Sequence, residues 1–336
     1  MHRVLLRVSW NKTISGRAGL QPCLADISSR SCHEIQDKVK EDKIMRDKMF
    51  MRFMTLPALL VFLLMGVYPT IQGLLNSFTS YNMTEIAEKE FIGIDNYVRM
   101  LTEMRFWQAL GRTLVFVVLS VGLSYMIGLV IAVLLNKINA VRNVYRIIFL
   151  IPMIIAPTIT ALNFKFMYNY NMGIINFFLN LAGIPNVDFL GDPSLALFST
   201  LAVDIWLGTP LAILILLAGI ESQSEAYYEA AKIDGASEWQ IFSEITFPIL
   251  KKFSVIVIVL RTMDALKVYE VIQLMTAGGP GTSSETLNIY ISKAGFSWFE
   301  MGYAAALGIF ALYFIMFIAK FIISKTGLFQ SEVSRA

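Results

Sequence analysis

The sequence predicts an all-α, polytopic membrane protein built as a bundle of about six transmembrane helices. Of its 336 residues, 56% are hydrophobic and 16% are charged, whereas a soluble domain is about a quarter charged. The apolar residues also come in runs of about twenty, the length that crosses roughly 30 Å of hydrocarbon. Composition and run length together exclude an ordinary soluble protein.

Six apolar runs are long enough to be the transmembrane helices. They cover approximately residues 54–78, 112–135, 147–168, 196–220, 252–275 and 302–323. Six crossings place both termini on the same side of the membrane. The third run contains Pro152 and Pro157, which a span tolerates where neighbouring helices or water satisfy the freed backbone groups.

The distribution of positive charge predicts which side that is. Residues 1–52 contain 11 Lys and Arg against six Asp and Glu. Lys137, Arg142 and Arg146 follow the second run without an acidic residue, whereas the link 169–195 has no Lys or Arg. Because cytoplasmic loops carry the excess of positive charge, we expect both termini to be cytoplasmic.

The basic tail before the first run has two other interpretations. A basic segment can bind nucleic acid, but before a first span it is more often a topology signal, so we expect no nucleic-acid partner. Cys23, Cys32 and His33 could ligate zinc, although three clustered residues in a weakly patterned tail are poor evidence. We therefore expect a reduced, solvated tail and no metal site.

The membrane body has no Cys and no His, because both cysteines and both histidines lie in that tail. A disulfide framework and a Cys/His metal site are thus excluded there. The tail is not a signal peptide either, since it lacks an apolar stretch before a cleavage site. Met45, Met49 and Met51 precede the first run, and we expect residues 1–44 to be a mis-called extension.

A charged segment, residues 221–250, separates the fourth and fifth runs and predicts two short helices with a bend between them. Ser222 to Glu225 and Ser237 to Gln240 each have the spacing of a capping box, which begins a helix. Gly235 fits the position after a helix end, where the backbone is left-handed. Pro248 suits the first turn of the next helix.

The composition of this segment predicts what it touches. Glu229 and Asp234 are acidic, and Ala230 and Ala231 are small enough to let another backbone come close. A helix lying on the membrane would instead carry Lys and Arg on its polar face, and an acidic one is repelled by anionic lipid. We therefore favour a protein-docking helix over a membrane-surface helix.

The same residues carry a family resemblance. Glu229, Ala230 and Ala231, then Gly235, then residues 245–248 (Ile-Thr-Phe-Pro) resemble the EAA–Gly–I-x-L-P loop of permease subunits of binding-protein-dependent ABC importers, with Phe247 replacing the usual Leu. Segments 91–97, 204–210, 261–265 and 278–281 are similar to permeases of the carbohydrate-uptake group, related to those for maltose and glycerol-3-phosphate. The resemblance covers roughly residues 53–325.

The resemblance implies a type I ABC importer permease fold with a cytoplasmic coupling helix. The chain would divide into an N-terminal tail (1–52), a first transmembrane helix with an outer segment (53–106), the transmembrane domain (107–325) containing the EAA loop (221–250), and a C-terminal tail (326–336). The residues expected to couple to the ATPase are Glu229, Ala230, Ala231, Asp234, Gly235, Trp239, Ile245 and Pro248.

The resemblance also implies the function and the partners. The chain would import a sugar or related polyol across a bacterial or archaeal cytoplasmic membrane. Its partners would be a second homologous permease, two cytoplasmic ATP-binding subunits that dock on the EAA loop, and an extracytoplasmic solute-binding protein. The chain has no G-x-x-x-x-G-K-[ST] phosphate loop of the kind that binds ATP. We therefore expect it to be no enzyme and to hold no cofactor, with ATP used by the partner.

Charged residues inside the apolar runs are candidates for the translocation path. Arg261, Asp264, Lys267 and Glu270 alternate in sign at three-residue steps, so neighbours can pair along one helix face. Buried ionisable groups in a membrane usually face the bundle interior or a water cavity. This series either lines the path or locks the permease pair, or it is a self-neutralised structural ladder.

Three residues outside that series join the candidates. Asp204 either contacts a polar solute or pairs with Lys165 or with a base of the fifth run. Asn163 could contact a sugar by hydrogen bonding. Trp206 could contact it by stacking, or it is a packing residue.

Two other functions compete with this assignment. A stand-alone secondary carrier often shows two matching halves with broken helices, but this sequence has no convincing internal repeat and a carrier needs no acidic docking loop. An intramembrane hydrolase needs a nucleophile–base or metal constellation, and the chain has no H-E-x-x-H motif.

Overall fold

The computed structural model describes residue 50 and residues 53–84, 89–137 and 142–326. The predictions about a zinc site and a late start fall on the tail and lie outside the described residues. The chain divides into two units, Met1–Ile71 and Gln72–Ala336, which are described separately.

The described part of the first unit is helical, and its helix continues across the unit boundary. The whole helix runs from Phe53 to Asn76 and is long and apolar enough to cross a membrane. It includes a π-helical turn, η3 (Leu63–Val67), which leads into α2 (Tyr68–Asn76). This confirms the first apolar run as a helix.

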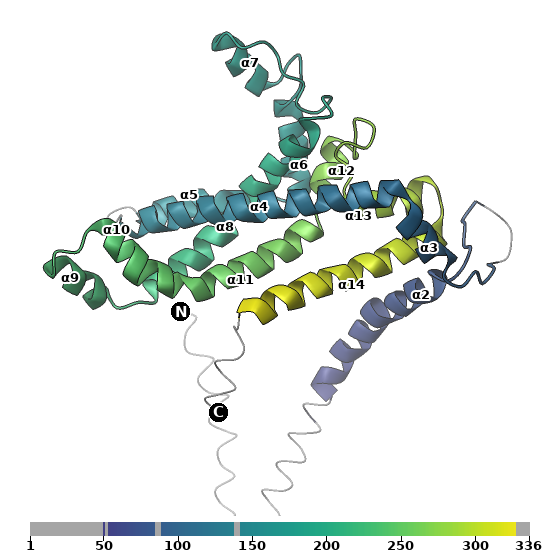
Figure 1. Ribbon diagram of the computed structural model, residues 1–336, viewed down its shortest axis with the longest axis horizontal. Coiled ribbons are helices and arrows are strands. Elements are labelled where there is room, and N and C mark those ends of the chain that lie inside the picture. Colours follow the sequence, from purple (N-terminus) through teal and green to yellow (C-terminus); the bar gives the residue numbers. More distant parts are fainter. Residues whose placement is uncertain (1–49, 51–52, 85–88, 138–141, 327–336) are drawn as a thin grey trace, which may run out of the picture. The chain divides into compact units, whose positions relative to one another are not determined.

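The second unit is helical throughout, apart from connecting loops and one isolated antiparallel bridge between Thr79 and Phe91 among its described residues. Its elements, drawn in Figure 1, are α3 (Asp95–Thr102), α4 (Met104–Lys137), α5 (Arg142–Ile154), α6 (Pro157–Met167), α7 (Ile174–Leu181), α8 (Ala196–Glu221), α9 (Glu225–Ile233), α10 (Glu238–Gln240), η4 (Ile241–Thr246), α11 (Phe247–Leu266), α12 (Glu270–Met275), α13 (Leu287–Ser292), η5 (Lys293–Ser297) and α14 (Met301–Thr326).

The centre of this unit is formed by α4, α8 and α11, which lie side by side (Figure 1). A Cβ built on Gly128 of α4 would lie 2.6 Å from the Cβ of Ala212 on α8, so the missing side chain lets the two helices approach closely. Leu216, Leu250 and Val257 are fully buried beside this contact. Small residues at helix interfaces serve the same purpose in membrane bundles generally.

The third apolar run is not one straight helix. Helices α5 and α6 meet at an angle of 91°, so the predicted span over 147–168 is broken between Ile154 and Pro157. Pro157 lies in the first turn of α6, and Ala156 before it has an extended backbone (φ −59°, ψ 134°). A proline both lacks the N–H that would continue the helix and disfavours helical geometry in the preceding residue.

The fifth run is also interrupted. Helix α11 ends at Leu266, and α12 begins only at Glu270. The Asn288 side chain donates hydrogen bonds to the carbonyl oxygens of Leu266 (2.9 Å) and Val268 (3.3 Å). These bonds satisfy carbonyls that the end of a helix leaves free, so the break is a built feature of the fold.

The number of spans is therefore close to the prediction but not identical to it. In the part of the chain that the structure describes, four helices are long and apolar enough to cross a membrane, or five if the bent α5–α6 pair is one span. Helix α11 is not among them, since it carries Lys251, Lys252, Arg261 and Asp264. It nevertheless packs along α8 and α4, both of which qualify.

Candidate functional site

The charged segment between α8 and α11 has the predicted bend, but only its first helix is separate, because α10, η4 and α11 follow one another without a break. Helix α9 ends at Ile233, and Gly235 two residues later has a left-handed φ of +79°. The N–H of Ala236 donates to the carbonyl of Ala231 (2.9 Å), and that of Gly235 donates to Lys232 (3.1 Å). This pair of bonds is a Schellman motif, which needs a residue without a side chain at the turn.

The starts of the two helices agree with the sequence in one case and differ in the other. Ser237 and Gln240 form the predicted capping box at the start of α10. At the start of α9, however, the cap is Ser224, whose hydroxyl accepts from the N–H of Ala226. Ser222 donates instead to the carbonyl of Gly219 at the end of α8 (2.8 Å), so the capping box predicted at Ser222 is wrong.

Most of the predicted coupling residues are exposed. This holds for Glu229, Ala230, Asp234, Gly235, Trp239 and Pro248, while Ala231 and Ile245 are half-buried. Trp239 is 72% exposed, and Ile233, which the sequence analysis missed, is 85% exposed. Two large apolar side chains thus flank Gly235 among exposed charged residues, Glu229, Lys232 and Asp234, which is typical of a protein contact.

The segment is attached to the bundle by charged residues around a cavity. The cavity has a volume of about 770 Å³ and lies between α9, α10 and the ends of α4, α5 and α8. Across it, Lys137 of α4 contacts Glu238 of α10 at 2.6 Å, and Arg146 of α5 pairs with Glu221 of α8. The hydrogen bond from Lys137 lowers the pKa of the Glu238 carboxyl below its usual range.

A second cluster lies inside the bundle, where three helices meet. Arg261 of α11 pairs with Asp204 of α8 at 2.7 Å and donates to Ser120 of α4 at 2.8 Å. Ser120 in turn donates to Asp204. Arg261 is 4% exposed, Asp204 8% and Ser120 0%, so this is a buried, mutually hydrogen-bonded ion pair.

This cluster distinguishes between the two kinds of basic partner proposed for Asp204. Its partner is the fifth-run base Arg261, whereas Lys165 donates to the carbonyl of Leu274 (2.8 Å). The alternating series does not form one continuous ladder, because Arg261 pairs with Asp204 of α8, although Asp264 and Lys267 do pair along the helix. Glu270 lies beyond the helix break, on α12.

The remaining path candidates are not gathered around this pair. Asp264 and Lys267 lie 3.8 Å apart with side chains 55% and 59% exposed. Asn163 is exposed. Trp206 is 38% exposed, and its ring lies edge-on to Phe164 with centroids 5.5 Å apart. The structure therefore separates one buried pair from four candidates that reach the surface of this chain.

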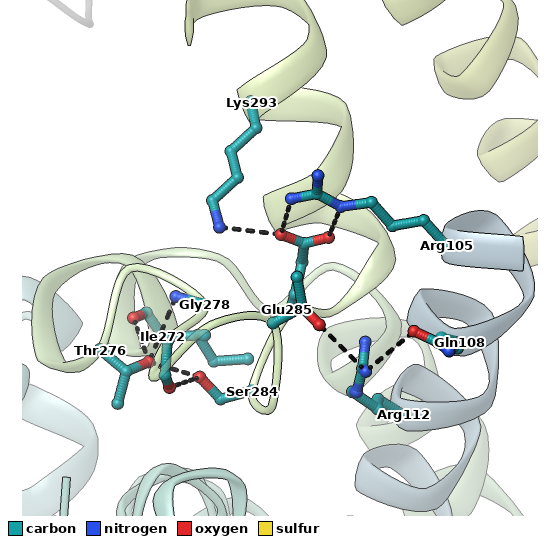
Figure 2. Close-up of polar contacts among 11 residues, drawn as sticks. Arg105, Gln108, Arg112, Ile272, Thr276, Gly278, Ser284, Glu285 and Lys293 are labelled. Atoms are coloured by element: carbon teal, nitrogen blue, oxygen red, sulfur yellow. Dashed lines mark hydrogen bonds and ion pairs between the residues drawn. The ribbon is translucent and has the colours of Figure 1, made fainter. Parts of the chain in front are cut away.

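A third polar cluster lies where the loop after α12 meets the start of α4 (Figure 2). Glu285 is fully buried and accepts from Arg105 at 2.7 and 2.8 Å and from Lys293 at 2.8 Å. Burial by itself raises the pKa of a carboxyl, but the two cations outweigh it, so the pKa of Glu285 is lowered. Gly278, with a φ of +82°, keeps the loop tight beside Lys293.

Three residues of these clusters were not singled out from the sequence. Ser120 gave no signal, because a serine in an apolar run is common. Glu285 lies four residues after the glycine-rich stretch 278–281, and Arg105 lies about 180 positions before it, so their pairing could not be seen from sequence spacing.

A family model described as "Binding-protein-dependent transport system inner membrane component" matches residues 124–326. The chain is 36% identical over 281 residues to the "Trehalose/maltose transport system permease protein MalF" of Thermococcus litoralis, covering 83% of this chain and 94% of that protein. It is 32% identical over 263 residues to the "Sulfoquinovosyl glycerol transport system permease protein SmoG" of Agrobacterium fabrum, covering 78% and 85%.

Two solved structures are similar over most of the chain. One is a bacterial ABC transporter involved in the import of the acidic polysaccharide alginate, with a TM-score of 0.76 and 25% identity over 85% of this chain and 98% of that one. The other is a bacterial alginate ABC transporter in complex with an alginate pentasaccharide-bound periplasmic protein, with a TM-score of 0.74, 25% identity, and coverage of 83% and 94%.

Proposed function

Because this chain belongs to the family of binding-protein-dependent transport system inner membrane components, we propose that it is the permease subunit of an ABC importer for a sugar or related polyol. The observation that carries this proposal is the match of most of the chain to sugar-transport permeases. The chain is a multi-pass membrane protein of that family. A stand-alone secondary carrier is not favoured by any of the relatives.

The exposed bend at Gly235 supports docking of a cytoplasmic ATPase. A rigid turn fixed by two backbone hydrogen bonds presents Ile233 and Trp239 to the surrounding space. Acidic residues beside them make a membrane surface an unfavourable partner. ATP is hydrolysed by the docked subunit, and this loop carries the resulting movement into the permease.

The other partners follow from the same family membership. A solute-binding protein delivers the substrate, a role supported by the similar alginate transporter, whose structure contains an alginate pentasaccharide-bound periplasmic protein. A second, homologous permease completes the path. The termini and the charged segment 221–250, called the coupling loop below, face the cytoplasm, because cytoplasmic segments carry the excess of Lys and Arg.

The substrate meets the exposed polar residues of the spans rather than the buried pair. Asp264 and Lys267 are more than half exposed beside helices that cross the membrane, and ionised groups there face a water-filled path or a partner rather than lipid. Trp206 and Asn163 supply a ring for stacking and an amide for hydrogen bonds, which suits a sugar.

The test is uptake by the complete transporter. The chain is co-expressed with the ATPase, second permease and binding protein encoded with it, and the complex is reconstituted into liposomes. We expect labelled sugar to accumulate only with ATP and the binding protein. Uptake by the chain alone, driven by an ion gradient, would establish the secondary carrier instead.

A further inference from the structure

We propose that Gly208 and Ser120 are positioning residues that keep Arg261 paired with Asp204. The cluster of Arg261, Asp204 and Ser120, called the clamp below, then fastens α8 and α11, the helices on either side of the coupling loop (221–250), to α4. The inference rests on the proposed function for its role in transport. It concerns two residues, Ser120 and Gly208, that do not belong to the coupling loop and do not reach the solute.

The clamp joins three helices at one point. Arg261 comes from α11, Asp204 from α8 and Ser120 from α4, and each of the three side chains contacts the other two. Ser124, one turn along α4, adds a longer contact to Arg261 at 3.4 Å. Separating any pair of these helices therefore breaks at least one hydrogen bond to a buried charge.

Gly208 is required because of the space that the guanidinium group occupies. It lies one turn after Asp204, and a Cβ built on it would overlap the guanidinium carbon and both terminal nitrogens of Arg261. The end of an arginine side chain is flexible when it is exposed, but Arg261 is only 4% exposed. Any residue larger than glycine at 208 thus displaces Arg261 from Asp204.

A displaced Arg261 has poor alternatives. Its Nε atom is already buried without a hydrogen-bond partner in the described part of the chain. Moving the group would leave Asp204 buried as an uncompensated charge, which is more costly than losing the whole pair. The site therefore has one favourable arrangement.

The position of the clamp relative to the coupling loop gives it its role. Asp204 lies about 26 Å along α8 from Glu221, and Arg261 about 21 Å along α11 from Phe247, at 1.5 Å per residue. The loop joins α8 and α11 at one end and the clamp joins them near the other, so the two helices move together. A displacement of the loop is therefore transmitted along both helices to the clamp inside the membrane.

The test uses a steric variant and its suppressor in the complete transporter. Gly208→Ala is expected to reduce the sugar moved per ATP hydrolysed roughly tenfold, within the range typical of coupling between two sites. Arg261→Lys removes the planar fork while keeping the charge. In Gly208→Ala/Arg261→Lys the collision is gone, and we expect a higher transport ratio than in Gly208→Ala alone.

Two controls separate this role from others. Gly122→Ala adds a methyl group on α4 where nothing lies within 4 Å, and we expect it to leave the ratio unchanged. Ser120→Ala removes one arm of the clamp and should lower the ratio less than Gly208→Ala does. A raised KM for sugar with a normal ratio in Gly208→Ala would overturn the proposal, because it would indicate a solute contact.

Thermal unfolding of the purified chain separates the clamp from the proposed function. We expect Gly208→Ala to lower the melting temperature and Arg261→Lys to restore part of it. If wild-type complex showed no ATP-driven uptake but this suppression held, the proposed function alone would fail. If Arg261→Lys improved neither the transport ratio nor the melting temperature of Gly208→Ala, the proposed clamp would be overturned.

Discussion

Lys137, the last residue of α4, contacts Glu238 at the start of α10 with an N–O distance of 2.6 Å. This pair links a long membrane-spanning helix directly to the second helix of the coupling loop. The Arg261–Asp204–Ser120 cluster connects the middle of the same helix, at Ser120, to α8 and α11. Movement of the coupling loop therefore has two routes to α4.

The Lys137–Glu238 pair is expected to contribute to coupling more than to stability. Both side chains are more than half exposed, and exposed pairs contribute little to folding. Lys137→Met should leave the melting temperature nearly unchanged but lower the sugar moved per ATP, by no more than about fivefold. The charge exchange Lys137→Glu/Glu238→Lys should restore the ratio, while Lys251→Met serves as the control.

Acidification should weaken the same pair. The pKa of Glu238 is lowered in the folded protein, so its stabilising effect is fully present above the unfolded value of about 4.5. It is lost as the pH falls through the lower, folded value. Nuclear magnetic resonance of the Glu238 carboxyl should show a lower pKa in wild type than in Lys137→Met.

Gly235→Val should uncouple hydrolysis from uptake. The left-handed backbone at +79° costs a β-branched residue roughly 1–2 kcal/mol, which reshapes the bend that we propose docks the ATPase. Gly183, with a φ of +78° and open space around it, offers a matched control far along the sequence. Gly183→Val should lose comparable stability with a normal transport ratio; equal ratios in both variants would contradict the role of Gly235.

Glu285→Gln should destabilise the protein. Removing one partner of a buried ion pair costs about 3–5 kcal/mol, and because Arg105 is one-third exposed we expect the lower end of that range. Glu90→Gln, at an exposed position, should have no such effect. The lowered pKa of Glu285 also means that wild-type stability from this cluster is present above about pH 4.5 and falls below it.

Asp264→Asn and Lys267→Met should raise the KM for sugar. Each substitution removes a hydrogen bond between a charged side chain and the sugar, which corresponds to about a tenfold increase in KM. The sugar moved per ATP should stay normal, because neither side chain belongs to the clamp. Lys251→Met, near the other end of α11, is the control, and an unchanged KM in both path variants would remove them from the translocation path.

The sequence predicts the coupling loop in more detail than any other part. Its caps, its bend and its glycine depend on residues a few positions apart, and such local geometry follows from the sequence of neighbours. Ser222 was misassigned because Ser224, two residues later, competes for the same role and caps α9 instead.

The breaks within the third and fifth apolar runs differ in how far the sequence could have predicted them. The break before Pro157 is local and could have been taken as a boundary, since proline disfavours a helix before it. The break after Leu266 depends on Asn288, which lies 22 positions along the chain. No periodicity of the apolar run could reveal a cap from so far away.

The partner of Arg261 could likewise not be chosen from the sequence alone. Pairing with Asp264 on the same face satisfied the spacing rule, and pairing with Asp204 required knowing that α8 and α11 lie together. The absence of a side chain at Gly208 allows the pairing with Asp204, because it leaves room for the Arg261 guanidinium between α8 and α11.

The sequence separation of the clamp residues has a consequence for biosynthesis. Asp204 precedes Arg261 by 57 positions, so at 5–20 residues per second the ribosome adds the arginine roughly 3 to 11 s after the aspartate. During that interval α8 enters the bilayer with an unpaired carboxylate, at a cost of about 2.5–3.5 kcal/mol near a helix centre. The apolar residues of α8 must therefore favour insertion by more than this cost, so that the helix stays in the bilayer until α11 is inserted and Arg261 pairs with Asp204.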